Sequence, residues 1–463
     1  MVAFGFGFGW LAACTPVETA SGWFDCGDGF DCGLLAVDGA EVAVTRHLAS
    51  VPIGRVAVAA SGGPGSSSIG LVHSLVTGID EPLWTDTTWI AMDNRGVGAS
   101  DAVSCVGDDW FDDVRSRDPV PASDADAAAL EASAATFRTG CLADRGEDGL
   151  ATLGTTTYAD DLDAFRAVLG VETLDFVGFS YGTWIGAVYA ATYPEHVGRF
   201  ALDGVVGPWT TRDEFLSRQV AGFDLALTRY FERCAADPEC PVADPAGTYD
   251  ALLAQAALAP LPAPTDPDGR VATVNELRWG VSSLLYGPDD DAFSAALAAA
   301  ADGDAAGFLA AADDGWGRDP ATGEYTKVYQ GYWAIGCLDL PWPDGWTAED
   351  LWALGASLDL DHPRIGSTIL TGEANCLDWP VAVAPPSLAA DPAPPLLLVV
   401  GRNDPATPYD DGIALQAALG NGSEVVTYEG DGHVAMFSDP TGCSYDVIRT
   451  FLAEGTIPTE TCP

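Results

Sequence analysis

Ser180 lies in a Gly-Phe-Ser-Tyr-Gly pattern at 178–182, whose residue types and spacing could make a serine hydroxyl reactive. The apolar run 173–177 precedes the pattern, and 183–190, a stretch of small residues with helical composition, follows it. A serine on such a tight turn between a strand and a helix is held in a strained, exposed position, and flanking glycines let the two elements approach closely. The arrangement predicts that Ser180 is a nucleophile, and the alternative is an idle serine in a glycine-rich turn.

A base and an acid that could activate this serine follow later in the chain. A serine hydroxyl is a weak nucleophile until a base takes its proton, and that base is usually a histidine oriented by a carboxylate. Of the five histidines, His433 lies in a glycine-flanked loop between the last apolar run and the last helical stretch. Asp404 follows the preceding apolar run and is therefore the expected acid. Asp410 and Asp411 are expected to begin the next helix, and Asp431 is expected to face solvent.

Acyl transfer also needs donors for the negative charge that develops on the carbonyl oxygen of the substrate. Tyr181, directly after the serine, offers one backbone N–H. Gly63, in the glycine-rich loop 62–65 after the third apolar run, offers the second. The alternative for this loop is a phosphate cradle, but neither a lysine nor a Walker pattern accompanies it.

Several acids in the middle of the chain could bind the free amine of a peptide substrate through a charge-assisted hydrogen bond. Asp339, beside a cysteine, and Glu373 are the two candidates for this role, and Asp213 and Glu214 are further ones. For each of them, a solvated surface acid is the more common alternative.

The elements that must position these residues follow two patterns. Up to about residue 207, apolar strand-like runs alternate with helical stretches, and strand-like runs return at 396–400 and 424–428. Alternating strands and helices predict a mostly parallel, doubly wound α/β sheet covered on both faces. Between these parts, 208–380 has the composition of helices and loops, with helical composition at 223–235 and 292–312 and a proline-rich linker at 258–269. We therefore expect an inserted helical cap.

The predicted organisation has five parts. They are a lipoprotein-type leader at 1–13, a tether and N-terminal segment at 14–32, the first part of the sheet domain at 33–207, the cap at 208–380 and the C-terminal part of the sheet domain at 381–463.

The charge balance excludes some classes of partner. The net charge is −48, from 68 acidic and 20 basic residues, and Lys327 is the single lysine. Without a basic patch, binding to nucleic acid or to an anionic membrane surface is not expected. An acidic surface favours cationic ligands such as free amino termini, although solubility is the plainer explanation for it.

The N-terminal segment predicts export. It is apolar from residue 2 to 13, too short to span a bilayer, and ends in Leu-Ala-Ala before Cys14, which resembles the lipobox of bacterial lipoproteins. No lysine or arginine precedes Cys14, although a leader normally begins with one. We expect a cell-surface lipoprotein or a secreted protein, attached to the membrane only through a lipid on Cys14.

The remaining ten of the eleven cysteines predict disulfide bonds in an oxidising compartment. Sequence alone leaves their connectivity open, but proximity favours two small loops and chain order favours three longer ones. These pairs are Cys26–Cys32, Cys234–Cys240, Cys105–Cys141, Cys337–Cys376 and Cys443–Cys462. Metal binding is the alternative, but neither a C-x-x-C pair nor a cluster of cysteine and histidine supports it, so we expect no metal.

Taken together, these motifs resemble a known family. The segments 62–65, 93–100 and 178–182 are similar to the proline-iminopeptidase-like branch of the α/β-hydrolases. The segments 375–380, 401–408 and 443–462 look like the secreted tripeptidyl-aminopeptidase group of actinobacteria.

This resemblance implies an α/β-hydrolase fold with a cap, paired cysteines and a serine exopeptidase that removes short peptides, either dipeptides and tripeptides or proline-type residues, from free amino termini. The triad chemistry needs no metal or organic cofactor. The nearest alternative is an esterase or amidase that uses the same triad on a small molecule. A second is a non-catalytic binding protein of the same fold.

Overall fold

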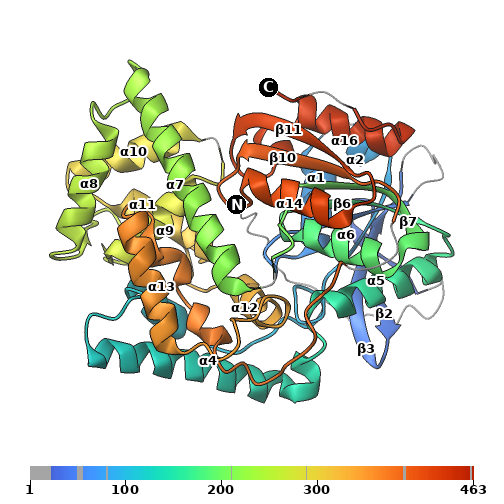
Figure 1. Ribbon diagram of the computed structural model, residues 1–463, viewed down its shortest axis with the longest axis horizontal. Helices are drawn as coiled ribbons and strands as arrows, with labels where there is room; N and C mark the ends of the chain where they lie inside the picture. Colours follow the sequence, from blue (N-terminus) through green and yellow to red (C-terminus); the bar gives the residue numbers. More distant parts are fainter. Residues whose placement is uncertain are drawn as a thin grey trace.

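The computed structural model describes residues 22–49, 56–79, 82–209, 211–287, 289–388, 393–458 and 461–463. A sheet flanked by helices fills one half of the molecule and a group of helices fills the other, with α12 (Val328–Asp339) between them (Figure 1). The expected leader at 1–13 and its Cys14 lie outside the described residues.

The described strands of the larger sheet follow the order β1-β2-β3-β5-β4-β6-β7-β10-β11. Their bounds are β1 (Phe24–Gly27), β2 (Phe30–Val37), β3 (Ala40–His47), β4 (Val56–Ala60), β5 (Thr88–Met92), β6 (Leu174–Phe179), β7 (Val197–Asp203), β10 (Leu397–Asn403) and β11 (Glu424–Asp431). The pairs from β5 through β11 are parallel, whereas β1, β2 and β3 add an antiparallel edge. The expected mostly parallel sheet is confirmed.

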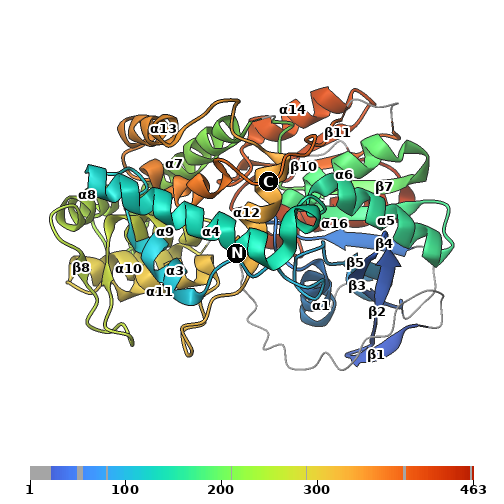
Figure 2. The same ribbon diagram turned by 90° about the horizontal axis from the view of Figure 1, so that it is seen from below.

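Helices cover both faces of this sheet, as Figure 2 shows. They are α1 (Ser68–Gly78), α2 (Pro82–Thr85), α5 (Thr155–Leu169), α6 (Tyr181–Thr192), α14 (Tyr409–Leu419) and α16 (Cys443–Glu454). Because side chains alternate along a strand, each strand fills two cores. Val58 and Ala60 of β4 share a core with α5, α6 and α14, whereas Ala57 and Ala59 share the other core with α1, α2 and α16.

The cap consists of helices joined by short turns. They are α7 (Arg212–Ala236), α8 (Pro245–Ala256), α9 (Val274–Leu284), α10 (Asp290–Ala301), α11 (Ala306–Trp316), α12, α13 (Ala348–Asp361) and the 3-10 turns η2 (Gly366–Leu370) and η3 (Glu373–Cys376). The stretch 292–312 is helical as expected, but it forms two helices, because Gly303 adopts a φ of 97° and separates α10 from α11. In the expected linker 258–269, β8 (Leu261–Pro262) pairs with β9 (Val271–Ala272). No described helix is long and apolar enough to cross a membrane.

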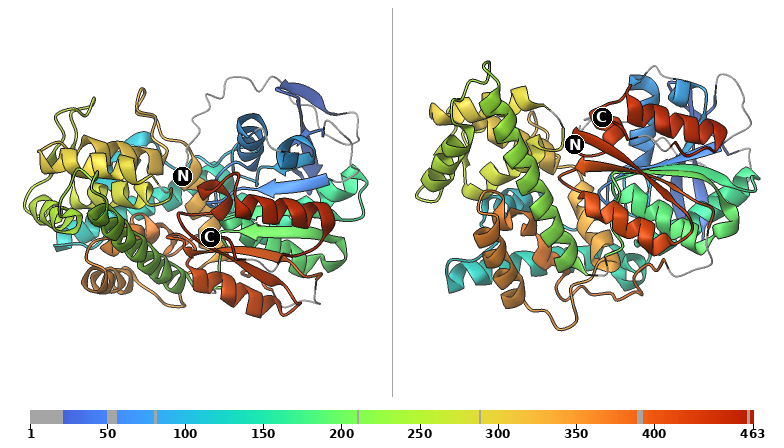
Figure 3. Two further views of the ribbon diagram at one scale, coloured as in Figure 1. Left: turned by 90° about the horizontal axis from the view of Figure 1, so that it is seen from above. Right: turned by 45° about the horizontal axis from the view of Figure 1, so that its top comes forward.

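Two helices that we expected within the sheet domain pack with the cap. α3 (Asp108–Ser116) contacts α9, and α4 (Asp124–Leu150) contacts η3. Both lie among the cap helices in Figure 2 and in the two views of Figure 3. Arg138 of α4 also donates a hydrogen bond to the carbonyl of Ala374 at 3.1 Å. The cap is therefore built from two separate stretches of the chain.

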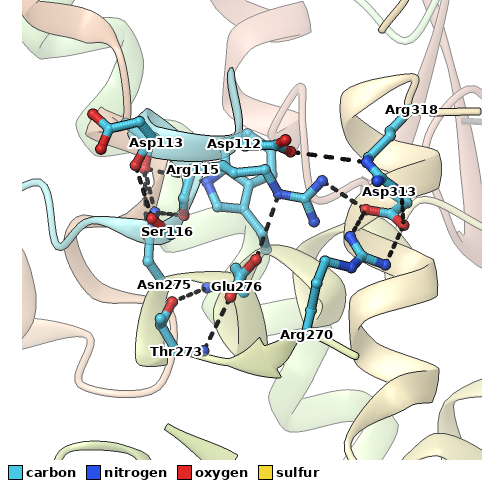
Figure 4. Close-up of polar contacts among 12 residues, drawn as sticks. Asp112, Asp113, Arg115, Ser116, Arg270, Thr273, Asn275, Glu276, Asp313 and Arg318 are labelled. Carbon is cyan, nitrogen blue, oxygen red and sulfur yellow. Dashed lines mark hydrogen bonds and ion pairs between the residues drawn. The ribbon is translucent and has the colours of Figure 1, made fainter. Parts of the chain in front are cut away.

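Figure 4 shows the ion pairs that join α3 to the rest of the cap. Arg115 of α3 is buried and pairs with Asp313 of α11 at 2.6 Å and with Glu276 of α9 at 3.7 Å. Arg270 and Arg318 pair with the same Asp313 carboxylate, at 2.7 and 3.4 Å. Removing one partner of such a buried pair leaves an uncompensated charge. The network therefore holds α3, α9 and α11 in one arrangement.

All ten described cysteines form disulfides, and the pairs are those that proximity and chain order favoured. Cys337–Cys376 joins α12 to η3, and Cys105–Cys141 fixes the start of the α3 segment to α4. Among the described residues, Cys26, Cys32 and His73 bring three potential metal ligands together. The two cysteines are bonded to each other, so neither offers the thiolate that a metal binds.

Candidate active site

Ser180 occupies the sharp turn between β6 and α6. Its φ of 55° and ψ of −122° form a conformation that a side-chain-bearing residue rarely adopts. A Cβ on Gly178 would lie 2.4 Å from the carbonyl oxygen of Gly182, and a Cβ on Gly182 would lie 2.3 Å from that of Ala60. Only glycine fits at both positions, so the close approach of strand and helix explains the pattern around the serine.

His433 and Asp404 are in direct contact. The Nδ1 atom of His433 lies 2.8 and 2.9 Å from the two carboxylate oxygens of Asp404. The backbone N–H groups of Ala406 and Thr407 each donate to Asp404 at 2.9 Å, and that of Val434 donates at 3.2 Å. The acid is therefore held by its own turn while it orients the imidazole, which leaves Nε2 as the nitrogen available to the serine.

The end of β7 brings the serine and the histidine to the same place. The N–H of Ser180 donates to the carbonyl of Asp203 at 3.0 Å. A Cβ on Gly204, the next residue, would lie 3.3 Å from Cε1 of the His433 ring. The Ser180 hydroxyl makes no hydrogen bond to another described residue. Such bonds often tighten only when substrate binds.

Asp203 anchors the chain after the histidine, a role that we did not predict. Its two carboxylate oxygens accept the N–H groups of Ala435 and Met436 at 2.9 and 2.8 Å. Burial raises the pKa of Asp203 to about 7. An acid that ends an apolar strand on the edge carrying Ser180 is the one signal that could have identified it.

The glycine-rich loop lies against the serine, as its expected role requires. A Cβ on Gly62 would lie 2.9 Å from Cβ of Ser180, and Gly63 has a φ of 113°. Tyr181 is the first residue of α6, so its N–H belongs to the free donors at a helix N-terminus. Tyr181 and the loop that carries Gly63, the two expected sources of oxyanion donors, therefore lie next to the serine, and the donor role of each N–H stays a prediction.

Asp339 is buried behind Tyr181, with 3% of its surface exposed. Its carboxylate accepts hydrogen bonds from the Tyr181 hydroxyl and from the hydroxyl and N–H of Thr155, the latter two at 2.6 and 3.1 Å. Burial raises the pKa of Asp339. The cap helix α12 thus contacts the residue that follows the serine.

Glu373 is also buried and paired. It forms an ion pair with Arg212, and Trp333 Nε1 donates to its other oxygen at 3.3 Å. Both Glu373 and Arg212 are 2% exposed. The amine-binding role of Asp339 and Glu373 stays a prediction, and both carboxylates already accept bonds from the protein.

The cap contacts the site at two places. The ring of Tyr286, which is half-buried, meets the ring of His433 edge-on at 5.2 Å. The backbone of α12 lies against the oxyanion loop, because a Cβ on Gly65 would lie 2.8 Å from the backbone nitrogen of Tyr332. The cap therefore contacts both the histidine and the oxyanion loop.

Two of the acids near the end of the chain have partners in α7 of the cap. Asp410 and Asp411 begin α14 as expected, and Asp411 pairs with Arg218 at 2.8 Å. Asp431 is partly exposed, with 21% of its side chain accessible, but its carboxylate also pairs with Arg229 at 2.6 Å and with Arg233 at 2.8 Å, which we did not expect. A long-range ion pair of this kind leaves no trace in the local sequence.

Comparison with known proteins agrees with this geometry. A family model described as the alpha/beta hydrolase fold matches residues 60–440. The chain belongs to the α/β-hydrolase family. It is a serine hydrolase, and its mostly parallel sheet, serine turn and late histidine are those of the family.

The relatives of this α/β-hydrolase carry two kinds of name. Serine protease Hip1 of Mycobacterium tuberculosis is 30% identical over 474 residues, which cover 96% of this chain and 89% of that protein. Tripeptidyl aminopeptidase of Streptomyces coelicolor is 29% identical, over 85% of this chain and 73% of that protein. Carboxylesterase B of Mycobacterium tuberculosis is 31% identical, over 86% of this chain and 77% of that protein.

Proposed function

We propose that the protein is an exported serine exopeptidase that releases short peptides, such as dipeptides and tripeptides, from free amino termini. The observation that carries the chemistry is the contact between His433 and Asp404, together with Asp203 at the end of β7, which binds both the N–H of Ser180 and the chain after His433. The relatives named serine protease and tripeptidyl aminopeptidase support peptides as the substrate class.

In this proposal Ser180 Oγ attacks the scissile carbonyl carbon while His433 Nε2 accepts the hydroxyl proton. Asp404 keeps the imidazole oriented, and the N–H groups of Tyr181 and Gly63 stabilise the oxyanion. The tetrahedral intermediate breaks its C–N bond, and the leaving amine takes the proton from the imidazolium. Water then gives a proton to the same imidazole and attacks the ester carbonyl carbon. The second tetrahedral intermediate breaks its bond to Ser180 Oγ, which takes the proton from the imidazolium, so the peptide is freed and the serine is restored.

Three features support an exopeptidase. Tyr286 and α12 of the cap stand over the histidine and the oxyanion loop, and a covered site favours the end of a chain over its middle. The net charge of −48 favours substrates with an ammonium group. The proposed amine-binding acids, Asp339 and Glu373, lie buried on the cap side of the site; Arg212 balances the charge of Glu373, so the attraction of an ammonium group would come mainly from Asp339.

A panel of fluorogenic tripeptide amides, their N-acetylated forms and simple aryl esters tests the proposal. Free peptides should be turned over at least about 100-fold faster than blocked ones, because a site built for an ammonium group rejects a substrate that lacks it. Equal turnover of free and blocked peptides would contradict an exopeptidase. Ser180→Ala should lose all activities while its urea unfolding midpoint stays unchanged.

The second candidate function is a carboxylesterase, which the relative named carboxylesterase B favours. The same three residues would then act on an ester, whose alkoxide leaves more readily than an amine. In the same panel, this function predicts fast turnover of aryl esters and little turnover of any peptide amide.

We also propose that the mature protein reaches an oxidising compartment and carries a lipid on Cys14. The five disulfides support such a compartment. The lipobox-like residues before Cys14 support the lipid. Intact-mass analysis of the membrane fraction should find a chain that begins at a diacylated Cys14. An unmodified chain that begins at Met1 would contradict the lipid anchor.

A further inference from the structure

The histidine loop, residues 430–434, is held from two sides. From the sheet domain, Asp404 binds the His433 ring and the Val434 N–H. From the cap, the backbone carbonyl oxygen of Tyr286 accepts a hydrogen bond from the backbone N–H of His433 at 2.8 Å. The ring of Tyr286 also meets the imidazole edge-on at 5.2 Å. The expected base therefore has direct partners in both halves of the molecule.

Asp431 adds an ionic tether two residues before His433. The guanidinium of Arg229 donates to both carboxylate oxygens of Asp431, at 2.6 and 3.2 Å, and Arg233 donates to one of them at 2.8 Å. Arg233 is itself fixed by Asp290, at 2.7 Å from two of its nitrogens. We call Arg229, Arg233 and Asp431 the cap latch.

A glycine makes the position of His433 dependent on such tethers. Asp431 ends β11, where it pairs with Asn403 of β10, and Gly432, with a φ of 101°, links Asp431 to His433. A glycine backbone has access to many conformations, so Gly432 alone does little to fix the position of His433. A Cβ on Gly432 would lie 3.3 Å from the Tyr286 oxygen, so the loop and the cap are already in close contact.

We propose that Arg229, Arg233 and Tyr286 are positioning residues that place the His433 base only while the cap is docked on the histidine loop. The proposal rests on the Ser180 and His433 roles given under Proposed function. Movement of α7 would pull on Asp431 and rotate the imidazole away from the serine. A bound substrate that keeps the cap docked would thereby keep the His433 imidazole in place beside Ser180. Occupancy of the site is then coupled to the rate of nucleophilic attack.

The test measures how fast a fluorophosphonate labels the serine of the intact protein. This reagent needs the activated serine but no peptide recognition, so the result does not depend on whether the natural substrate is a peptide or an ester. Arg229→Gln combined with Arg233→Gln should slow labelling about tenfold, because a small displacement of a catalytic group is enough for such a loss. The same variant should lower kcat on the preferred fluorogenic substrate and leave KM unchanged.

Arg218→Gln is the matched control. Arg218 stands on the same helix and pairs with Asp411 of α14, so its loss removes another ionic bridge between cap and sheet domain without touching the histidine loop. Labelling of this variant should stay within about twofold of the wild type. Replacing Arg229 and Arg233 by lysine, which keeps both charges, should restore most of the rate, whereas a purely structural defect would not respond to charge.

The outcomes are distinct. Wild-type labelling rates in the double glutamine variant would overturn the latch, and so would a slowing that the double lysine variant does not reverse. An equal slowing in Arg218→Gln would overturn it too, because general loosening of the cap would then explain the effect. Absence of labelling in the wild type would instead refute the proposed role of Ser180 itself.

Discussion

The cap meets the sheet domain at two junctions that differ in burial. At the α12 junction, Asp339 is 3% exposed and accepts a hydrogen bond from Tyr181. Gly331 also packs closely against Gly65, because a Cβ on Gly331 would lie 3.0 Å from the Cα of Gly65. α7 also has a buried contact, since a Cβ on Gly222 would lie 2.5 Å from the Pro405 carbonyl oxygen, but where α7 meets the histidine loop the Arg229 and Asp431 side chains are 36% and 21% exposed. We call this last contact the exposed junction. The α12 junction is a packed interior, and the exposed junction is an ionic contact that water reaches.

This difference separates two tasks. The buried junction contacts the oxyanion loop and the residue after the serine, so it fixes the part of the site that stabilises charge. The exposed junction contacts the histidine loop, and half-exposed ion pairs form and break at low free-energy cost. The difference indicates that the cap holds the part of the site around Ser180 and the oxyanion loop rigidly, whereas its contact with the histidine loop can break and re-form.

A methyl group on Gly65 should break the buried junction most severely. Its Cβ would lie 2.3 Å from the Val328 carbonyl oxygen, at a φ of 101°. Gly65→Ala should lower the free energy of unfolding by more than about 3 kcal/mol and turnover by more than about 100-fold. Gly303→Ala, at a φ of 97° with open space around it, is the control in urea unfolding. Equal losses in both variants would mean that backbone strain, not the junction, matters.

The anchor of the histidine loop on the sheet side should make stability depend on pH. The folded-state pKa of Asp203, about 7, lies above its model-peptide value of 3.8, so the folded protein keeps a proton that the unfolded chain has lost. The contribution of Asp203 to the free energy of unfolding is fully present below pH 3.8. It decreases by on the order of 1.4 kcal/mol per pH unit between these two pKa values and is lost once the pH has risen through about 7. The difference in unfolding free energy between wild type and Asp203→Asn should follow this slope. A difference that is constant with pH would contradict the prediction.

Removing charge from Asp339 should weaken the buried junction by a moderate amount. The Asp339 carboxylate accepts hydrogen bonds from three donors, two on Thr155 and one on Tyr181. Asp339→Asn replaces one of its two acceptor oxygens with an NH₂ group, so at least one of these hydrogen bonds is lost. We expect a loss of about 1–3 kcal/mol in unfolding free energy. Tyr181→Phe removes one of the donors and should cost less, about 1 kcal/mol. If the tyrosine variant were the more destabilised in urea unfolding, Asp339 would not be the centre of the junction.

The exposed junction should give the smallest effect and the strongest dependence on salt. A double-mutant cycle on Arg229 and Asp431 should yield a coupling of about 0.2–1 kcal/mol at low ionic strength. Screening should remove most of it at about 0.5 M salt. The Arg218–Asp411 coupling should persist, because the Asp411 side chain is 1% exposed. Equal salt sensitivity of the two pairs would erase the distinction between buried and exposed contacts.

Local rules explain what the sequence predicted well. The turn at Ser180 requires glycine at 178 and 182 because the strand and the helix pack too closely for a Cβ. This requirement is visible in five consecutive residues of the sequence. His433 and Asp404 were identified by their place after the last strands, since the carboxyl ends of parallel strands meet at one edge. The mostly parallel sheet followed from the alternation of strands and helices.

Long-range contacts explain what the sequence did not reveal. Arg115 and Asp313 are 198 residues apart, so nothing in the periodicity of α3 placed that helix in the cap. Asp203 and Asp431 resemble solvated acids in sequence, and only the folded chain brings their partners to them. The break between α10 and α11 was missed because alanine-rich composition on both sides outweighed one glycine.

The most direct test of the central claim traps the acyl-enzyme. A tripeptide aryl ester with a free amino terminus is mixed with the protein, quenched in acid within the first turnover and digested for mass analysis. The account predicts one tripeptidyl group, attached to Ser180, that is absent from Ser180→Ala and does not accumulate in His433→Ala. A peptidyl group on another residue, or full turnover by Ser180→Ala, would contradict it.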